Sequence, residues 1–255
     1  LEIVLSRNDV NKEDQDSIYQ FVNSQLKYDY YHLISNQGNE KICALASWLN
    51  NILNANLLPE SSKNDHLKLS DLTPDNCARE LDYYLPCKDF KVKVLNKLCH
   101  EFYAKVVKDN NLSHIPDLPD LKKSNFKGFM KGSLDLVAKF TTKQGDKFFM
   151  IDYKSNYLGD SFGDYTQDSI LKSIFEARYD VQILFYSLAL YRFLKCTLHD
   201  FLYEKDFGGV MYLYLRGMKS NNTVSPGQFY VRPSEELIKR LSDLFDGIEE
   251  NNNHE

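Results

Sequence analysis

The chain has 255 residues, 43% of them hydrophobic, so it can bury one substantial core with a smaller appended lobe. Its net charge of −5 argues against a surface that is basic throughout, although a local basic patch can still bind nucleic acid. The five cysteines form no CxxC pair and no apolar run approaches roughly 18 residues, so we expect free thiols in a reducing, cytoplasmic compartment and no membrane association.

Residues 1–76 are predicted to form an N-terminal helical region. Apolar residues recur at three- and four-residue spacing over 13–28 and 41–53, which is the period of an amphipathic helix. The stretch 57–76 is rich in Ser, Asn, Asp and Pro and is predicted to be a loop that ends this region.

Residues 77–248 are predicted to form an α/β core, in which a mixed sheet is flanked by helices. The predicted strands are 78–86, which ends at Pro86, then 130–140, 146–156 and the fully apolar 207–218. Gly145 indicates a tight hairpin between the second and third of these strands. The predicted helices are 91–107, one long helix over 167–194, and 234–245 with Ser234 as its N-cap. The polar tail 249–255 is predicted to be disordered.

Two charged residues, Asp152 and Lys154, end the otherwise apolar strand 146–156. Because side chains alternate along a strand, these two share one face. Buried charges are costly unless they are paired, hydrogen-bonded or bound to a metal. The pattern therefore indicates either a structural ion pair or half of an active site, and the spacing alone does not decide between them. The same Asp-x-Lys pattern at Asp89 and Asp120 lies in polar surroundings and is predicted to be solvated surface.

A second isolated acid, Asp135, lies 17 residues before Asp152 on the preceding strand. A hairpin would bring both acids to one end of the sheet. Two carboxylates with a nearby lysine would form a hard-oxygen site for Mg²⁺, which suits phosphodiester hydrolysis. Lys154 would position or deprotonate the attacking water, or stabilise the charge of the reacting phosphate.

Two further features favour the active-site interpretation. Gln182 and Tyr186 lie at i and i+4 on one helical face, although this pair would be equally ordinary in a core. Residues 121–154 hold eight lysines, Lys131 among them, against three aspartates, a local charge of +5. Such a stripe suits a phosphate backbone, but charge runs are more often solvated faces.

Four segments, GFMKGSLDLV, FFMIDYKSNYLGD, RYDVQILFYSLALYRFL and FGGVMYLYLRG, resemble the nuclease domain of the RecB family of helicase–nucleases. That domain belongs to the PD-(D/E)XK, restriction-endonuclease-like superfamily. The resemblance runs from about Glu80 to Pro233 and is loose before residue 77. It implies the restriction-endonuclease-like fold and a metal-dependent deoxyribonuclease that acts in DNA repair and recombination.

The resemblance also implies roles for single residues. Asp135, Asp152 and the backbone carbonyl of Tyr153 would be metal ligands, and Lys154 would be the catalytic lysine. Gln182 and Tyr186 match a Q-x-x-x-Y motif that organises the site and the DNA, and Glu80 matches an acidic strand position. The implied metal is Mg²⁺, with Mn²⁺ as a substitute and Ca²⁺ as an inhibitory occupant.

One departure from the family concerns a metal-ligating histidine on an N-terminal helix, followed by Leu-Glu. None of the six histidines lies in that context, and His32 is the nearest by position. Since the chain begins with Leu1-Glu2 and not with Met, and shows no signal peptide, we expect it to be a piece of a longer protein in which the histidine lies upstream.

The predicted function is thus a DNA nuclease that works with RecC-like and RecD-like subunits and with a recombinase. The alternative is a non-catalytic module of the same fold that docks those subunits or the recombinase. A restriction-type endonuclease is disfavoured because no target-recognition segment is evident. No Walker A sequence is present, so ATP hydrolysis is not expected of this stretch.

Overall fold

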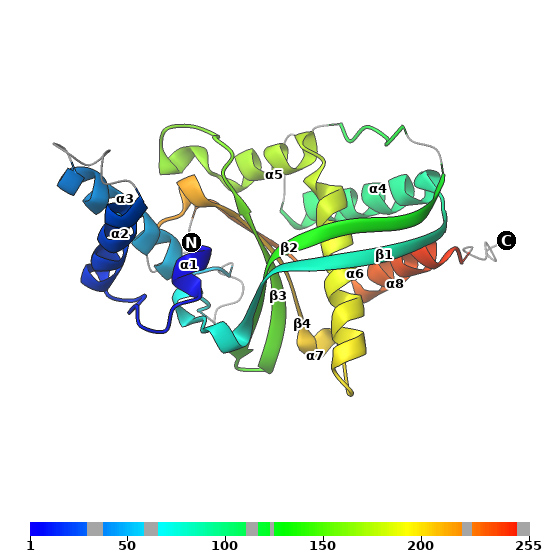
Figure 1. Cartoon of the computed structure of the whole chain (residues 1–255). Helices are drawn as coiled ribbons and strands as arrows, with labels where there is room; N and C mark the ends of the chain where they lie inside the picture. Colours follow the sequence, from blue (N-terminus) through cyan, green and yellow to red (C-terminus); the bar gives the residue numbers. More distant parts are fainter. Residues whose placement is uncertain (30–37, 59–65, 111–116, 123–124, 221–225, 249–255) are drawn as a thin grey trace.

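The computed structural model describes residues 1–29, 38–58, 66–110, 117–122, 125–220 and 226–248 (Figure 1). The strands are β1 (Cys77–Phe90), β2 (Phe126–Thr142), β3 (Gly145–Lys154), β4 (Phe207–Tyr214) and β5 (Gln228–Val231). The α-helices are α1 (Glu2–Leu5), α2 (Gln15–Asp29), α3 (Gly38–Asn54), α4 (Val92–Asp109), α5 (Gln167–Glu176), α6 (Tyr179–Thr197), α7 (Tyr203–Asp206) and α8 (Glu235–Asp246). Among these, no helix is long and apolar enough to cross a membrane.

The five strands form one sheet in the order β1-β2-β3-β4-β5. Strands β3 and β4 pair in parallel, and the other neighbours pair antiparallel, so the predicted mixed α/β sheet is confirmed. The predicted hairpin at Gly145 is also confirmed, because Thr142 pairs with Gly145, whose φ of 106° lies in the left-handed region.

Helices cover both faces of the sheet (Figure 1). Helices α4, α5, α6 and α8 pack on one face, which we call the α6 face. Helices α1, α2 and α3 pack on the other, which we call the α3 face. Residues on both sides of the predicted boundary at 76/77 share the core of the α3 face. The boundary itself stays a prediction, and the predicted tail 249–255 lies outside the described residues.

Several predicted element bounds were wrong, among them the start of β2 at Phe126 and the end of β3 at Lys154. Strand β1 continues through Pro86 to Phe90, which is tolerated because β1 is an edge strand. The single long helix over 167–194 is two helices, broken at Arg178, whose φ is 57°. Strand β4 ends at Tyr214, where a 3₁₀ turn over Leu215–Gly217 begins.

The helix over 234–245 and its cap are confirmed. The hydroxyl oxygen of Ser234 accepts a hydrogen bond from the backbone N–H of Leu237, and α8 starts at the next residue, Glu235. All eight residues of β4 are buried, as its apolar sequence predicts for a strand covered on both faces. The helices α1 and α7 and the strand β5 were not predicted, since each is too short to show a period.

Strands β1 and β2 change faces midway, at Glu80 and Asp135. Leu134 packs on the α6 face, whereas Leu136, two residues on, packs on the α3 face. On β1, Cys77 packs on the α3 face and Leu81 packs on the α6 face. Glu80, between them, has a φ of 46°, a conformation that side chains with a Cβ rarely adopt. The result is a strong local twist, after which β1 and β2 bend away from β3 (Figure 1).

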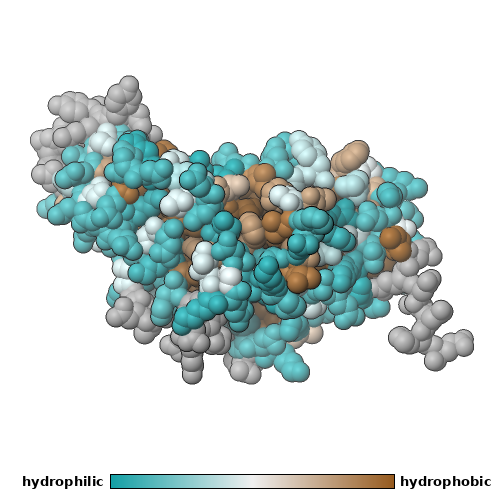
Figure 2. Space-filling model, turned by 90° about the horizontal axis from the view of Figure 1, so that it is seen from below, coloured by the Kyte–Doolittle hydropathy of each residue, from teal (hydrophilic) through white to brown (hydrophobic). Residues whose placement is uncertain are grey.

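The side of the molecule that Figure 2 shows is largely hydrophilic. Figure 2 shows one side of the molecule, on which hydrophobic residues gather near the centre and hydrophilic residues surround them.

Candidate active site

Asp152 and Lys154 lie at the carboxyl end of β3, and both side chains point to the α6 face. Their partners on β4 are Tyr212 and Tyr214, and both of these are packed in the core of that face. Asp152 is 2% exposed and Lys154 is 8% exposed, so the two charges are buried as predicted.

Asp135 approaches the same point from β2. The pairing of β2 with β3 ends at Leu136 and Ile151, one residue short of the two acids. Beyond that point the backbone N–H of Tyr153 donates to Oδ2 of Asp135 at 3.1 Å. The Asp135 carboxylate thus takes the place of the strand-to-strand hydrogen bond that is missing at this point. The bond fixes Asp135 beside the backbone that links Asp152 to Lys154.

The Lys154 ammonium is held by four groups. Its Nζ lies 2.6 Å from Oδ2 of Asp152 and donates to Oε1 of Gln182 at 3.0 Å. It also lies 3.9 Å from the ring centroid of Tyr179 and 4.6 Å from that of Tyr212, which are cation–π distances. The contact with Oδ2 of Asp152 is a short, buried ion pair.

Gln182 links the lysine to helix α6. Its Nε2 donates to the hydroxyl oxygen of Tyr186 at 2.6 Å, and its Oε1 accepts from the Tyr212 hydroxyl at 2.6 Å. The ring of Tyr186 meets that of Tyr83 edge-on at 6.1 Å. Tyr83 can lie there because it crosses Gly132, where a Cβ would come within 2.3 Å of its ring. Gln182 and Tyr186 therefore share a face directed at Lys154, as the spacing predicted.

Two residues of this cluster were missed from the sequence. Tyr179 lies three residues before Gln182, so the i, i+3 spacing on the same helix could have identified it. Tyr212 belongs to a different strand, and only the pairing of β3 with β4 brings it beneath Lys154.

Burial governs the protonation chemistry of the cluster. The pKa of Asp152 is raised to about 6, because removal from water and, to a smaller extent, the charge of Asp135 outweigh the lowering effect of Lys154. Burial also raises the pKa of the Tyr186 and Tyr212 hydroxyls, so both are neutral hydrogen-bonding groups at pH 7.

The donors present fit a hard divalent cation. Asp135, Asp152 and the Tyr153 carbonyl supply only oxygens, which Mg²⁺, Mn²⁺ and Ca²⁺ prefer. Oδ2 of Asp152 is buried and already faces the Lys154 ammonium at 2.6 Å, so the chemistry of the donor set carries the fit. Within the described ranges no group of three or more His, Cys, Asp or Glu side chains could hold a metal, so the fit depends on two carboxylates and a backbone oxygen. His32 lies outside the described residues.

Of the two other predicted residues, Glu80 lies beside Asp135 and Lys131 lies farther along β2. Glu80 is exposed, and the register of Arg79 with Leu136 and Leu81 with Leu134 places it opposite Asp135. Lys131 is four residues from Asp135, about 13 Å along the strand.

The lysine stripe is partly neutralised by acids on the surface. The Lys131 Nζ lies 3.1 Å from Oδ2 of Asp82 and stacks over Tyr84. Lys139 forms a similar pair with Asp146 at 3.5 Å. The stripe therefore offers less positive charge to a phosphate backbone than the sequence suggests.

No protein-family model matches the chain. The chain is similar to proteins described as "RecBCD enzyme subunit RecB". It is 35% identical to that of Haemophilus influenzae over 203 residues, or 79% of the chain, and 32% identical to that of Escherichia coli over 205 residues, or 80%. The similarity to the Mycobacterium tuberculosis subunit is 34% over 125 residues. The chain spans only 15%, 16% and 11% of the length of these three relatives.

Proposed function

Because the chain is a RecB-like domain, we propose that it is a metal-dependent nuclease that hydrolyses phosphodiester bonds of DNA. The observation that carries this proposal is the buried Asp152–Lys154 pair, 2.6 Å apart, with Asp135 beside it. A buried ion pair contributes little to stability by itself, so chemistry accounts for it better than packing does.

Asp135, Asp152 and the Tyr153 carbonyl would hold Mg²⁺. When bound, the ion would neutralise charge on the phosphate and lower the pKa of a bound water. Of the chain's own groups, Lys154 would bind a phosphate oxygen and stabilise the charge that develops on it. The two tyrosine rings and Gln182 would keep the ammonium in place, so that it need not reorganise during the reaction.

The name of the similar proteins suggests the wider assembly. We propose that the longer protein works with RecC-like and RecD-like subunits, and that DNA strands reach this site from a helicase. A recombinase is a further proposed partner in DNA repair and recombination.

The test is a cleavage assay on linear and circular single-stranded DNA in Mg²⁺, Mn²⁺, Ca²⁺ and EDTA. We expect cleavage in Mg²⁺ and Mn²⁺ and none in Ca²⁺ or EDTA. Asp152→Asn is the matched variant, since it keeps the shape of the side chain and removes the charge. Equal cleavage by this variant would rule out the proposed site.

A non-catalytic docking module is the second candidate, and one observation favours it. Asp152 and Lys154 already neutralise each other, so they can close the sheet edge as a structural pair. In that case Asp152→Asn would lower the melting temperature, and the parent would show no metal-dependent cleavage. The nuclease proposal instead expects the parent to show metal-dependent cleavage.

A further inference from the structure

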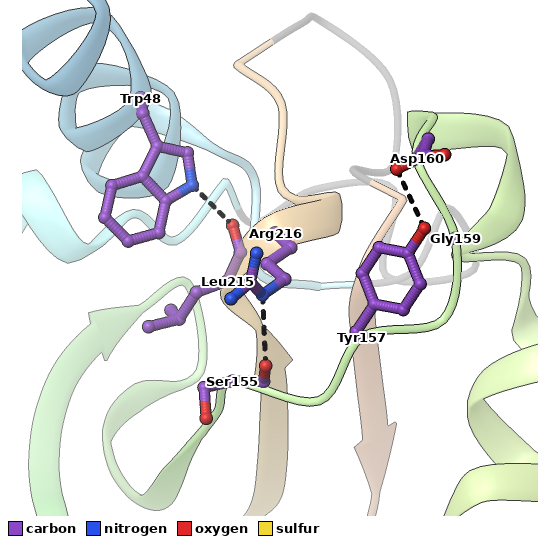
Figure 3. A pocket seen from close by; sticks show the side chains of 7 residues that line it. All are labelled: Trp48, Ser155, Tyr157, Gly159, Asp160, Leu215 and Arg216. Atoms are coloured by element: carbon purple, nitrogen blue, oxygen red, sulfur yellow. Dashed lines mark hydrogen bonds between the residues drawn. The ribbon is translucent and has the colours of Figure 1, made fainter. Parts of the chain in front are cut away.

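A pocket of about 480 Å³ opens directly beside the proposed cleavage site. Figure 3 shows its walls: helix α3, the segment that follows β3, and the 3₁₀ turn that follows β4. Ser155 lines the pocket and is the residue after Lys154, so the two Cα atoms are about 3.8 Å apart. The pocket therefore lies at the same end of β3 as the catalytic lysine, one residue further along the backbone.

Two aromatic rings line the pocket and are partly open to solvent. Tyr157 is 62% exposed and Trp48 is 37% exposed. Both are held in place, because the Trp48 Nε1–H donates to the Leu215 carbonyl at 3.0 Å and the Tyr157 hydroxyl donates to Asp160 at 2.8 Å (Figure 3). Fixed, exposed aromatic rings are the groups on which proteins stack unpaired nucleobases.

The pocket also carries a positive charge. Arg216 is exposed, and its Nε donates to the Ser155 carbonyl at 3.1 Å, which fixes the guanidinium between Trp48 and Tyr157 (Figure 3). A guanidinium binds phosphate through parallel N–H donors. Asp160 is the acid in the lining and would repel a phosphate, so the phosphate belongs on the Arg216 side and the base near Tyr157.

We propose that this pocket binds one nucleotide of single-stranded DNA next to the bond to be cleaved. The base stacks on Tyr157, the phosphate pairs with Arg216, and Trp48 lines the other side of the pocket. The strand must be single, because in a duplex the bases stack on one another and do not expose their faces to a protein ring. This inference rests on the proposed function, which it extends from the reacting phosphate to the adjacent nucleotide.

The chain has one tryptophan, so tryptophan fluorescence, excited selectively over that of the 17 tyrosines, reports on this pocket alone. The experiment is a titration of the 255-residue chain with oligothymidylate in EDTA, where metal-dependent cleavage does not occur. We expect saturable quenching of Trp48 and a Kd about ten-fold weaker in both Tyr157→Ala and Arg216→Ala. Neither residue belongs to the proposed catalytic cluster, and melting temperatures verify that the variants are folded.

Two variants serve as matched controls. Phe193→Ala removes an exposed aromatic ring from α6, and Lys172→Ala removes an exposed positive charge from α5; both should bind like the parent. The absence of quenching, or an unchanged Kd in Tyr157→Ala and Arg216→Ala, would overturn the proposal. Equal quenching by a blunt duplex would overturn the single-strand assignment.

The same titration separates this inference from the proposed function. Cleavage in Mg²⁺ without quenching in EDTA would discard the pocket and keep the nuclease. Quenching with the expected variant effects but no cleavage in any metal would discard the nuclease and keep the pocket as a DNA-binding site.

Discussion

The two faces of the sheet are built differently. Toward α1, α2 and α3, strands β3 and β4 present apolar side chains: Phe149, Ile151, Met211 and Leu213. Toward α6 the same two strands bury Asp152 and Lys154 among tyrosine rings. Burial of apolar surface stabilises a fold, whereas burial of charges costs free energy that pairing only partly recovers. The α6 face also buries apolar residues, Met150 and Val210 among them, so the comparison teaches that both faces supply stability and that only the α6 face gives up some of it to place charged groups.

The largest expected effect on the α3 face is that of Phe149→Ala. Phe149 is 2% exposed, packs edge-on against Phe140 at 5.8 Å, and lies so close to Gly208 that a Cβ there would meet its ring at 2.7 Å. Its removal should lower the free energy of unfolding by about 3–5 kcal/mol. Urea denaturation measures this, with Leu202→Ala, an exposed residue, as a control expected within about 0.5 kcal/mol of the parent. Cleavage per folded molecule should not change.

On the α6 face, Lys154→Met should have the opposite effect, with a large loss of cleavage and a smaller change in stability. The methionine keeps the aliphatic stem between Tyr179 and Tyr212 and removes the charge. We expect cleavage to fall by about 100- to 1,000-fold while single-stranded DNA is still bound. Stability should change less than in Phe149→Ala, because Asp152 can take up a proton once its partner is gone. Turnover and melting temperature are the measurements, and normal cleavage by the variant would mean that the lysine is only a structural partner.

The cost of the buried carboxylate should be visible in the pH dependence of stability. The folded pKa of Asp152, about 6, lies above its ordinary value of 3.8, so the folded state binds the proton more tightly. The stabilisation is complete below pH 4 and is lost as the pH rises through 6. In EDTA, the parent should therefore lose about 2–3 kcal/mol relative to Asp152→Asn between pH 4 and pH 7. Denaturation of both proteins across that range is the check, and a constant difference between them would contradict the shift.

Local patterns in the sequence predicted which of the candidate side chains lie together better than they predicted where helices and strands end. The period of two along β3 places Asp152 and Lys154 together, and the period of the helix does the same for Gln182 and Tyr186. The break at Arg178 carries no glycine or proline, and depends on distant contacts: Nη1 of Arg178 donates to the Pro119 carbonyl at 2.6 Å. A prediction from local sequence patterns cannot include such contacts, because the partners are distant in the sequence. For the same reason it ends β1 at Pro86, since the edge position of the strand is a property of the whole sheet.

A smaller effect is expected from the pair on α6. Tyr186→Phe removes only the hydroxyl that accepts from Gln182, and Gln182→Ala removes the amide that accepts from Lys154. Each should slow cleavage about ten-fold by loosening the lysine, with a smaller change in stability. Single-turnover rates and melting temperatures separate the two effects. If both variants cleave at the parental rate, the two residues belong to the core and not to the site.

The smallest expected effect is at Glu80, where β1 passes from one face to the other. Its φ of 46° costs about 1 kcal/mol for a residue with a Cβ and almost nothing for glycine. Glu80→Gly should therefore stabilise the fold by about 0.5–1 kcal/mol, less the entropy that glycine adds to the unfolded chain. Glu80→Ala is the matched control, because it also removes the carboxylate but keeps the Cβ and the strain. An equal gain in both variants would point to the charge and not to the backbone. Cleavage by the same two proteins tests the role in the site that the resemblance implies for Glu80. If both variants cleave more slowly, the Glu80 carboxylate supports Asp135, which lies opposite it. If only Glu80→Gly cleaves more slowly, the rigid backbone at residue 80 is what positions Asp135.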